Sequence, residues 1–279
     1  MTGDLRFMLI TAVPEVARHA EAAGIDRIFI DTEVAGKAER QGHVDTHKAA
    51  HSLADVPAVA AGLDAAELMV RLNPPSAHSA TEVDQAIAGG AQRLMLPWFH
   101  SADEVQAFLS AVDGRVPVTL LVETPAALSR LPVLLPLLGQ DDEIYFGLND
   151  LRLGMGLDFL FEPLAAGLLD EPARQCRAAG VAFGFGGVGR VGQGALPSDW
   201  IMGEHVRLGS RWVVLSRAFH GGAECLADIK AQLDLADEVS ALQAVEEHFR
   251  GAGADELAAN RERLIERTYA LAGQTEKDS

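Results

Sequence analysis

The sequence predicts an α/β fold in which eight parallel strands close into a (β/α)8 barrel, followed by additional C-terminal helices. Short apolar runs alternate with helical patterns along most of the chain, as expected of repeated strand–helix units. In addition, two neighbouring apolar runs, residues 117–122 and 143–146, are followed closely by Glu123 and Asp150. Apolar runs that hold acidic residues back until their ends are typical of buried parallel strands that bring functional groups to one end of a barrel.

Eight runs have the length and apolar content of buried strands. They are residues 6–11, 27–31, 68–71, 93–97, 117–122, 143–146, 181–185 and 212–216. Helices are predicted between them at residues 14–23, 80–88 and 101–112. The last of these helices opens with a capping box of Ser101 and Glu104. Right-handed crossovers between eight such units close a barrel. An open doubly wound sheet is the alternative, but no G-x-G-x-x-G motif follows the first strand.

We expect two parts, a catalytic barrel at residues 1–222 and a helical extension at residues 223–279. The extension contains three helical patterns, at residues 223–235, 239–250 and 254–272. The first could complete the barrel. The apolar faces of the other two need a surface to cover them, and we expect another subunit to provide it, so the sequence predicts a homo-oligomer.

Composition excludes several classes of partner. The chain has 279 residues and a net charge of −17, which argues against binding to nucleic acid or to an anionic membrane. Cys176 and Cys225 are the only cysteines and form no CxxC motif, so neither a disulfide framework nor a zinc site is expected. We find no signal sequence and no apolar span long enough to cross a bilayer, and therefore expect a cytoplasmic protein.

The predicted strand ends gather polar and special residues at one face of the barrel. They are Asp31, Glu33, Arg71, Asn73, Pro97, Trp98, Glu123, Asn149, Asp150, Gly186, Gly187, Ser216 and Arg217. Two carboxylates on adjacent strands, Glu123 and Asp150, suit a divalent cation such as Mg²⁺ or Mn²⁺. The alternative is that Glu123 caps a turn before Pro125 and that Asp150 caps a short helix.

Arg71 stands at the end of an apolar strand, where its planar guanidinium could hold a substrate carboxylate through two parallel hydrogen bonds. A structural ion pair with Glu33 or Asp31 is the alternative. A metal beside an arginine suggests that the substrate is an anionic 2-oxo acid.

Four motifs in order resemble the HpcH/HpaI aldolase and citrate lyase family over about residues 6–219. They are Val-Arg-Leu-Asn at 70–73, Met-Leu-Pro at 95–97, Val-Glu-Thr-Pro at 122–125 and Gly-Leu-Asn-Asp-Leu at 147–151. The resemblance implies a TIM barrel of the phosphoenolpyruvate/pyruvate superfamily and aldol chemistry that depends on Mg²⁺, Mn²⁺ or Co²⁺. It also implies a hexamer or trimer, commonly with exchanged C-terminal helices.

The same resemblance implies roles for individual residues. Glu123 and Asp150 would be the metal ligands, and Arg71 would bind the carboxylate and oxo group of pyruvate. Backbone amides of Gly147, Leu148, Asn149 and Asp150 would hold the other carboxylate oxygen, and Pro97 and Trp98 are predicted to line the substrate site.

One departure concerns proton transfer. The family typically reads Asp-x-Glu-His after the second strand, whereas this chain reads Asp-Thr-Glu-Val at residues 31–34. His43, Lys37 and Glu33 are therefore the candidate acid/base residues, with a solvated polar loop as the alternative. His47 and His51 have the four-residue spacing of one helix face, and we expect that face to point to solvent rather than to a metal.

The glycine-rich segment at residues 184–194, with Arg190 and Arg217, could bind phosphate or could be a tight turn over the barrel. Taken together, the sequence predicts a metal-dependent carbon–carbon lyase acting on a 2-oxo acid and an aldehyde. An acyl-CoA lyase of the citrate or malyl-CoA type and a non-catalytic metabolite-binding barrel are the alternatives.

Overall fold

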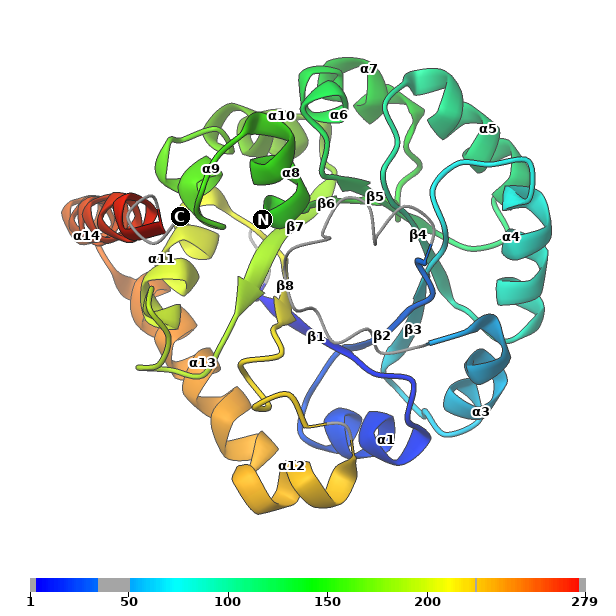
Figure 1. Ribbon diagram of the computed structural model, residues 1–279, viewed down its shortest axis with the longest axis horizontal. Coiled ribbons are helices and arrows are strands. Elements are labelled where there is room, and N and C mark those ends of the chain that lie inside the picture. Colours follow the sequence, from blue (N-terminus) through cyan, green and yellow to red (C-terminus); the bar gives the residue numbers. More distant parts are fainter. Residues whose placement is uncertain (1–3, 35–50, 224, 276–279) are drawn as a thin grey trace.

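The computed structural model describes residues 4–34, 51–223 and 225–275. Eight parallel strands form a closed barrel in sequence order, with β8 pairing with β1, and helices surround it (Figure 1). The strands are β1 Arg6–Ile10, β2 Arg27–Asp31, β3 Glu67–Arg71, β4 Arg93–Leu96, β5 Val118–Val122, β6 Glu143–Phe146, β7 Ala182–Val188 and β8 Trp212–Leu215. The predicted fold class and all eight predicted strands are confirmed.

The three helices predicted between the strands are present as α1, α4 and α5, and further helices lie between the other strands. In chain order, the described helices between the strands are α1 Pro14–Ala22, η1 Leu53–Asp55, α3 Val56–Ala60, α4 Ser79–Ala88, α5 Ala102–Val112, α6 Pro125–Ser129, α7 Leu131–Leu134, η2 Leu135–Leu137, α8 Leu148–Met155, α9 Glu162–Ala165, α10 Asp170–Ala179 and α11 Ser198–Leu208. The capping box of α5 is formed, because Ser101 accepts a hydrogen bond from the amide of Glu104. In the described residues, no helix is long and apolar enough to cross a membrane.

Two apolar layers hold the barrel together. The larger layer lies between strands and helices, and the smaller fills the barrel interior. The interior layer consists of Met8, Phe29, Met69, Met95, Leu121, Tyr145 and Trp212. Side chains alternate along each strand, so that Ile28 and Ile30 belong to the outer layer while Phe29 points inward. Burial on both faces explains why the strands read as continuous apolar runs.

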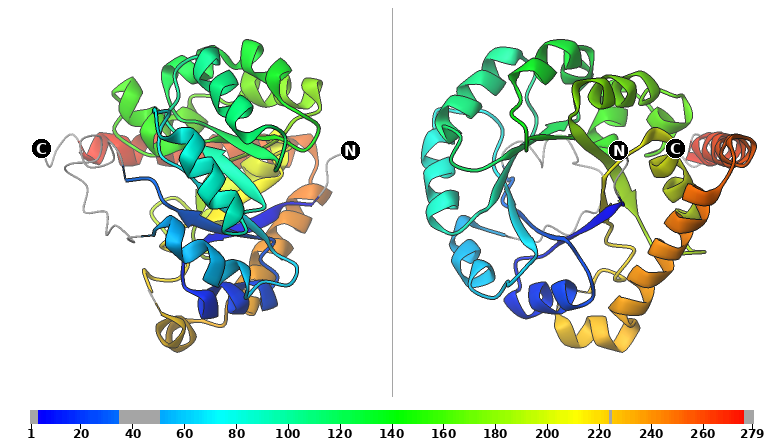
Figure 2. Two further views of the ribbon diagram at one scale, coloured as in Figure 1. Left: turned by 90° about the vertical axis from the view of Figure 1, so that its right-hand side faces the viewer. Right: turned by 180° about the vertical axis from the view of Figure 1, so that it is seen from behind.

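Three further helices follow β8: α12 Leu226–Gln232, α13 Leu235–Gly251 and α14 Ala254–Thr275. Both α13 and α14 pack on α11, and α14 also contacts α9, so they cover one flank of the barrel (Figure 2). Val239, Leu242, Phe249 and Leu264 are buried there. We expected that the apolar faces of these helices would not be covered by their own barrel. That expectation is wrong, because both helices pack on α11. Assembly into an oligomer stays a prediction.

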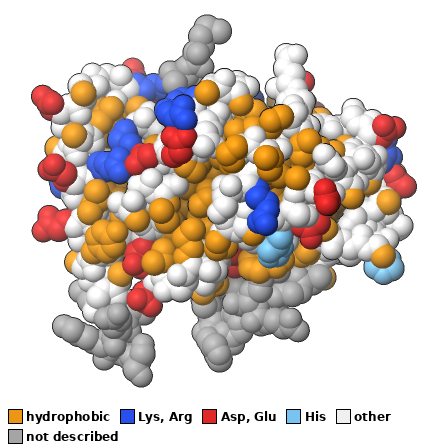
Figure 3. All heavy atoms as spheres, turned by 90° about the horizontal axis from the view of Figure 1, so that it is seen from above, with side chains coloured by type: hydrophobic (Ala, Val, Ile, Leu, Met, Phe, Trp, Pro, Cys, Tyr) orange, Lys and Arg blue, Asp and Glu red, His pale blue; other side chains and the backbone are white. Residues whose placement is uncertain are grey.

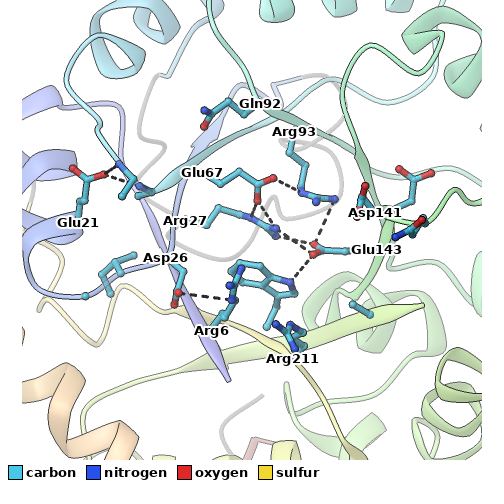
Figure 4. Close-up of a pocket in the computed structure, with 18 of the residues that line it drawn as sticks. Arg6, Glu21, Asp26, Arg27, Glu67, Gln92, Arg93, Asp141, Glu143 and Arg211 are labelled. Carbon is cyan, nitrogen blue, oxygen red and sulfur yellow. Dashed lines mark hydrogen bonds and ion pairs between the residues drawn. The ribbon is translucent and has the colours of Figure 1, made fainter. Parts of the chain in front are cut away.

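A polar layer closes the N-terminal end of the barrel, beside a cavity of about 700 Å³ (Figure 4). Arg27 is 1% exposed and donates to Glu67 over 2.6 Å and to Glu143 over 2.9 Å. Arg93 donates to the other oxygen of Glu67 over 3.0 Å. The indole of Trp212 donates to Glu143 over 2.6 Å, and the guanidinium of Arg27 lies 3.5 Å from the centre of its ring. In this layer the positive charges of two arginines are paired with the negative charges of two glutamates.

Candidate active site at the C-terminal end of the barrel

The predicted strand-end residues meet at the C-terminal end of the barrel. Asp31 and Arg71 are register partners on β2 and β3, and Glu123 and Asp150 follow β5 and β6. Glu33, Glu123 and Asp150 are at most 7% exposed. Buried carboxylates are costly unless they are paired or bind a cation, so this grouping is the candidate functional site.

Glu123 is held by the backbone around it. The amide of Trp98 donates to Glu123 Oε1 over 2.9 Å, and Trp98 adopts a left-handed conformation with φ of 48° to do so. A Cβ atom at Gly147 would lie 2.7 Å from the Cβ of Glu123, so only glycine fits beside this side chain. The alternative in which Glu123 caps the turn before Pro125 is wrong, because Thr124 is the N-cap of α6.

The protonation of Glu123 depends on its neighbours. Burial raises the pKa of Glu123 to about 8, and the carboxylates of Asp150 and Glu33 act in the same direction, whereas Arg71 opposes them. The carboxyl group therefore retains a proton near neutral pH when no other cation is present. A divalent cation bound here would take the place of that proton.

Asp150 lies in the first turn of α8, and the helix is capped by Gly147 rather than by Asp150 as the alternative supposed. The amides of Leu148 and Asn149 also belong to this turn. Amides at a helix N-terminus have no partner within the helix and favour anions, which is the property expected of a binding site for a carboxylate oxygen. The side chain of Asn149 accepts a hydrogen bond from Arg152 over 3.4 Å.

Arg71 forms an ion pair with Asp31, which was the alternative to a role in substrate binding. Its Nε and Nη2 atoms donate to the two oxygens of Asp31 over 2.9 and 2.6 Å, and Glu33 lies 3.5 Å from Nη2. Burial opposes the charge, but Asp31, Glu33 and Glu123 raise the pKa of Arg71 above its usual value. Within the described ranges, Nη1 makes no hydrogen bond. Asp31 therefore orients the guanidinium through Nε and Nη2.

His51 is a site residue that the sequence did not reveal. It precedes η1 in an irregular segment, and its Nδ1 accepts a hydrogen bond from the amide of Asp31 over 3.2 Å. The prediction of a solvent-facing helix at this position is wrong. His43, Lys37 and His47 lie outside the described residues. Val34, where the family that the sequence resembles has histidine, is 69% exposed.

The glycine-rich segment leaves β7 and is fastened to α11. The amide of Gly189 donates to Ser198 over 3.0 Å, and that of Gly192 donates to Asp199 over 3.0 Å. These bonds support the tight-turn interpretation, and phosphate binding stays a prediction. Pro97 is buried and Trp98 is half-buried at the end of β4.

Among the residues that the structure describes, no cluster of three or more His, Cys, Asp or Glu side chains could hold a metal ion. Glu123 and Asp150 would supply two ligands of the hard oxygen type. Substrate and water commonly complete the shell of Mg²⁺, which is bound through one or two carboxylates.

Comparison with known proteins identifies the family of the chain. The model of the HpcH/HpaI aldolase/citrate lyase family matches residues 6–182, a range that includes Arg71, Glu123 and Asp150. The HpcH/HpaI aldolase from Desulfitobacterium hafniense DCB-2 has a similar structure, with 17% identity, a TM-score of 0.57 and coverage of 84% of this chain and 95% of that chain. An HpcH/HpaI aldolase/citrate lyase family protein from Burkholderia cenocepacia J2315 is also similar, with 18% identity and a TM-score of 0.56. The match covers 76% of this chain and 88% of that chain. No curated protein matches the chain.

Proposed function

Because the chain belongs to the HpcH/HpaI aldolase/citrate lyase family, we propose that it is a lyase that uses a divalent cation to form or cleave a carbon–carbon bond next to a pyruvate-like 2-oxo acid. The observation that carries the proposal is the charge of the site. Burial raises the pKa of Glu123 to about 8, and the carboxylates of Asp150 and Glu33 act in the same direction, whereas Arg71 opposes them. Burial disfavours the ionised form of Glu123, and a bound divalent cation would stabilise that form.

Glu123 and Asp150 are the residues that would hold Mg²⁺, Mn²⁺ or Co²⁺. When bound, the cation would act as a Lewis acid on the 2-oxo group and stabilise the enolate that forms. The far edge of Arg71, oriented by Asp31, binds the substrate carboxylate. Amides in the first turn of α8 receive the other carboxylate oxygen.

Proton transfer to the partner substrate needs a group with a pKa near neutrality. We propose His51 as a candidate beside Glu33, His43 and Lys37, because its ring contacts the backbone of the residue that orients Arg71. If Nδ1 accepts the proton of the Asp31 amide, the neutral imidazole carries its proton on Nε2. In that tautomer Nε2 is the donor atom of the ring.

Exchange of the methyl protons of pyruvate in D₂O, with and without Mn²⁺, tests the reaction without knowledge of the aldehyde. Exchange that requires Mn²⁺ and disappears in Glu123→Gln supports the proposal. If pyruvate binds but does not exchange, the chain is a metabolite-binding barrel. A screen of aldehydes and of acyl-CoA thioesters, read by product mass, separates an aldolase from an acyl-CoA lyase.

We also propose that the protein is a homo-oligomer. The face seen in Figure 3 carries many apolar side chains, and Figure 1 places α7 on that side. Val133 of α7 is 56% exposed. Exposed apolar surfaces of this kind mark contact sites. Light scattering should give a mass of several chains, and Val133→Glu should lower it if this face is the contact.

A further inference from the structure

Tyr145 of β6 places a hydroxyl group in the apolar interior of the barrel. Its ring belongs to the inner layer and is 5% exposed. The hydroxyl donates to the carbonyl oxygen of Gly186 over 2.5 Å and accepts from the amide of Val214 over 3.0 Å. Because these partners lie on β7 and β8, one side chain links three consecutive strands.

The hydroxyl sits where the pairing of β7 with β8 is irregular. Gly184 is paired with Trp212, and the next pair is Gly187 with Val214, so three residue steps on β7 oppose two steps on β8. An extra residue of this kind is a β-bulge, and it leaves backbone groups without partners in the ladder. The hydroxyl of Tyr145 satisfies two such groups, one on each strand.

The bulge also touches the helix that carries Asp150. A Cβ atom at Gly184 would lie 2.5 Å from Cε2 of Tyr145, so the backbone of β7 rests directly on the tyrosine ring. Gly186 has φ of 56°, and a Cβ atom there would lie 3.1 Å from Cδ1 of Leu148. Leu148 is the first residue of α8, two residues before Asp150. A continuous set of contacts therefore joins the hydroxyl to the first turn of α8.

We propose that Tyr145 is a positioning residue for the active site: its hydroxyl holds the β7 bulge against Leu148 and thereby fixes the turn that contains Asp150. Burial raises the pKa of Tyr145 above its usual value, so the hydroxyl keeps its proton and donates at any working pH. The inference deepens the proposed function, and only its metal-binding readout rests on that function.

The test compares Tyr145→Phe with Tyr269→Phe, which removes the hydroxyl of the other tyrosine of the chain, 48% exposed on α14. In Tyr145→Phe, hydrogen exchange should become about tenfold faster in peptides covering residues 147–153 as well as 186–188, with no change in α13. Mn²⁺ should bind roughly 10- to 100-fold more weakly, the effect typical of a group that orients a metal ligand. Tyr269→Phe should behave as the unmodified protein does.

Two further variants separate positioning from a general loss of stability. Gly186→Ala presses on Leu148 while keeping the hydroxyl, and it should give the same local exchange pattern. Leu242→Ala destabilises α13 away from the site, and it should leave Mn²⁺ affinity unchanged.

Faster exchange confined to residues 186–188, or equal across the chain, would overturn the proposal. If the unmodified protein binds no Mn²⁺, the proposed metal site is wrong, and the exchange of residues 147–153 still decides the role of Tyr145. If Tyr145→Phe does not fold, Gly186→Ala tests whether the bulge fixes the turn of α8, and exchange that is faster only at residues 186–188 in that variant would overturn the proposal.

Discussion

The two ends of the barrel use the same residue types in opposite ways. At the N-terminal end, Arg27 and Arg93 face Glu67 and Glu143, and the network is closed by Trp212. At the C-terminal end, the guanidinium of Arg71 lies among the carboxylates of Asp31, Glu33 and Glu123, and burial raises the pKa of Glu123. A cation bound there would favour the ionised form of Glu123, whereas the N-terminal network already contains its own pairs of opposite charge. We therefore propose that the N-terminal network serves the fold and that the C-terminal one serves the reaction.

The largest effect is expected from a substitution of Glu123, at the C-terminal end of the barrel. Glu123→Gln should lower kcat by at least about 10²- to 10³-fold and abolish Mn²⁺ binding, because the variant removes a ligand. Without metal, its melting temperature near neutral pH should stay about the same, since glutamine replaces a carboxyl group that is already protonated there. Steady-state kinetics and a Mn²⁺ titration measure the two effects. Normal turnover in this variant would refute the metal assignment.

At the N-terminal end of the barrel, a substitution is expected to lower stability and to leave kcat unchanged. Glu143→Ala leaves Arg27 buried without one of its partners, and breaking a buried pair in this way costs about 3–5 kcal/mol. Urea denaturation measures the loss of stability, and kcat per folded molecule should be unchanged. Glu171→Ala, which breaks an exposed pair with Arg174, is the control and should unfold as the unmodified protein does. A loss of kcat in folded Glu143→Ala would mean that the two ends are coupled.

The acid/base assignment is tested by two histidines. His51→Ala should lower kcat by about 10²-fold with little change in pyruvate affinity, the effect typical of a positioned acid/base group. The pH profile of kcat/KM should lose its limb near neutrality. His43→Ala, at the position predicted from the sequence, is the companion variant. If only His43→Ala shows these changes, the role of His51 is limited to its contact with Asp31.

Arg71→Lys tests whether the far edge of the guanidinium binds substrate. A lysine offers a point charge instead of a planar fork, so pyruvate affinity should fall by about tenfold, with a smaller change in Mn²⁺ affinity. Calorimetric titration measures both. Equal losses would show that Arg71 only supports the metal site through Asp31 and Glu33.

The smallest expected effect is a drift of stability with pH. In the metal-free protein, burial raises the pKa of Glu123 from 4.5 to about 8, so between these values the folded state holds a proton that the unfolded state releases. The stabilisation is therefore complete below about pH 4.5 and is lost as the pH rises through 8. The melting temperature should fall between pH 6 and pH 9. Glu123→Gln or saturating Mn²⁺ should flatten this dependence, and a rising melting temperature would contradict it.

The barrel was predictable because its strands are buried on both faces and end in polar residues. The same logic located Glu123 and Asp150, since parallel strands end at one face. The partners of Arg71 were less certain, because a guanidinium at a strand end suits either a carboxylate of the protein or one of the substrate. The structure shows the carboxylate of the protein, Asp31, and the substrate carboxylate stays a prediction.

His51 and the N-terminal network could not be predicted from local patterns. His51 follows Asp31 by 20 residues, and no local pattern in the sequence pairs its ring with the amide of Asp31. Arg27, Glu67, Arg93 and Glu143 begin strands, where charged residues normally face water, and periodicity does not indicate that they converge inside a barrel. The bulge of β7 was also missed, because glycine suits a bulge and a turn equally.

The pairing of β1 with β8 has a consequence for synthesis of the protein. The barrel can close only when Trp212–Leu215 meets Arg6–Ile10, which is the first strand of the barrel to leave the ribosome. At translation rates of about 5–20 residues per second, the two partners emerge roughly 10–40 s apart. During that interval the growing sheet exposes an edge that other chains can join. We therefore expect nascent chains that stop before Trp212 to bind chaperones and to aggregate when released.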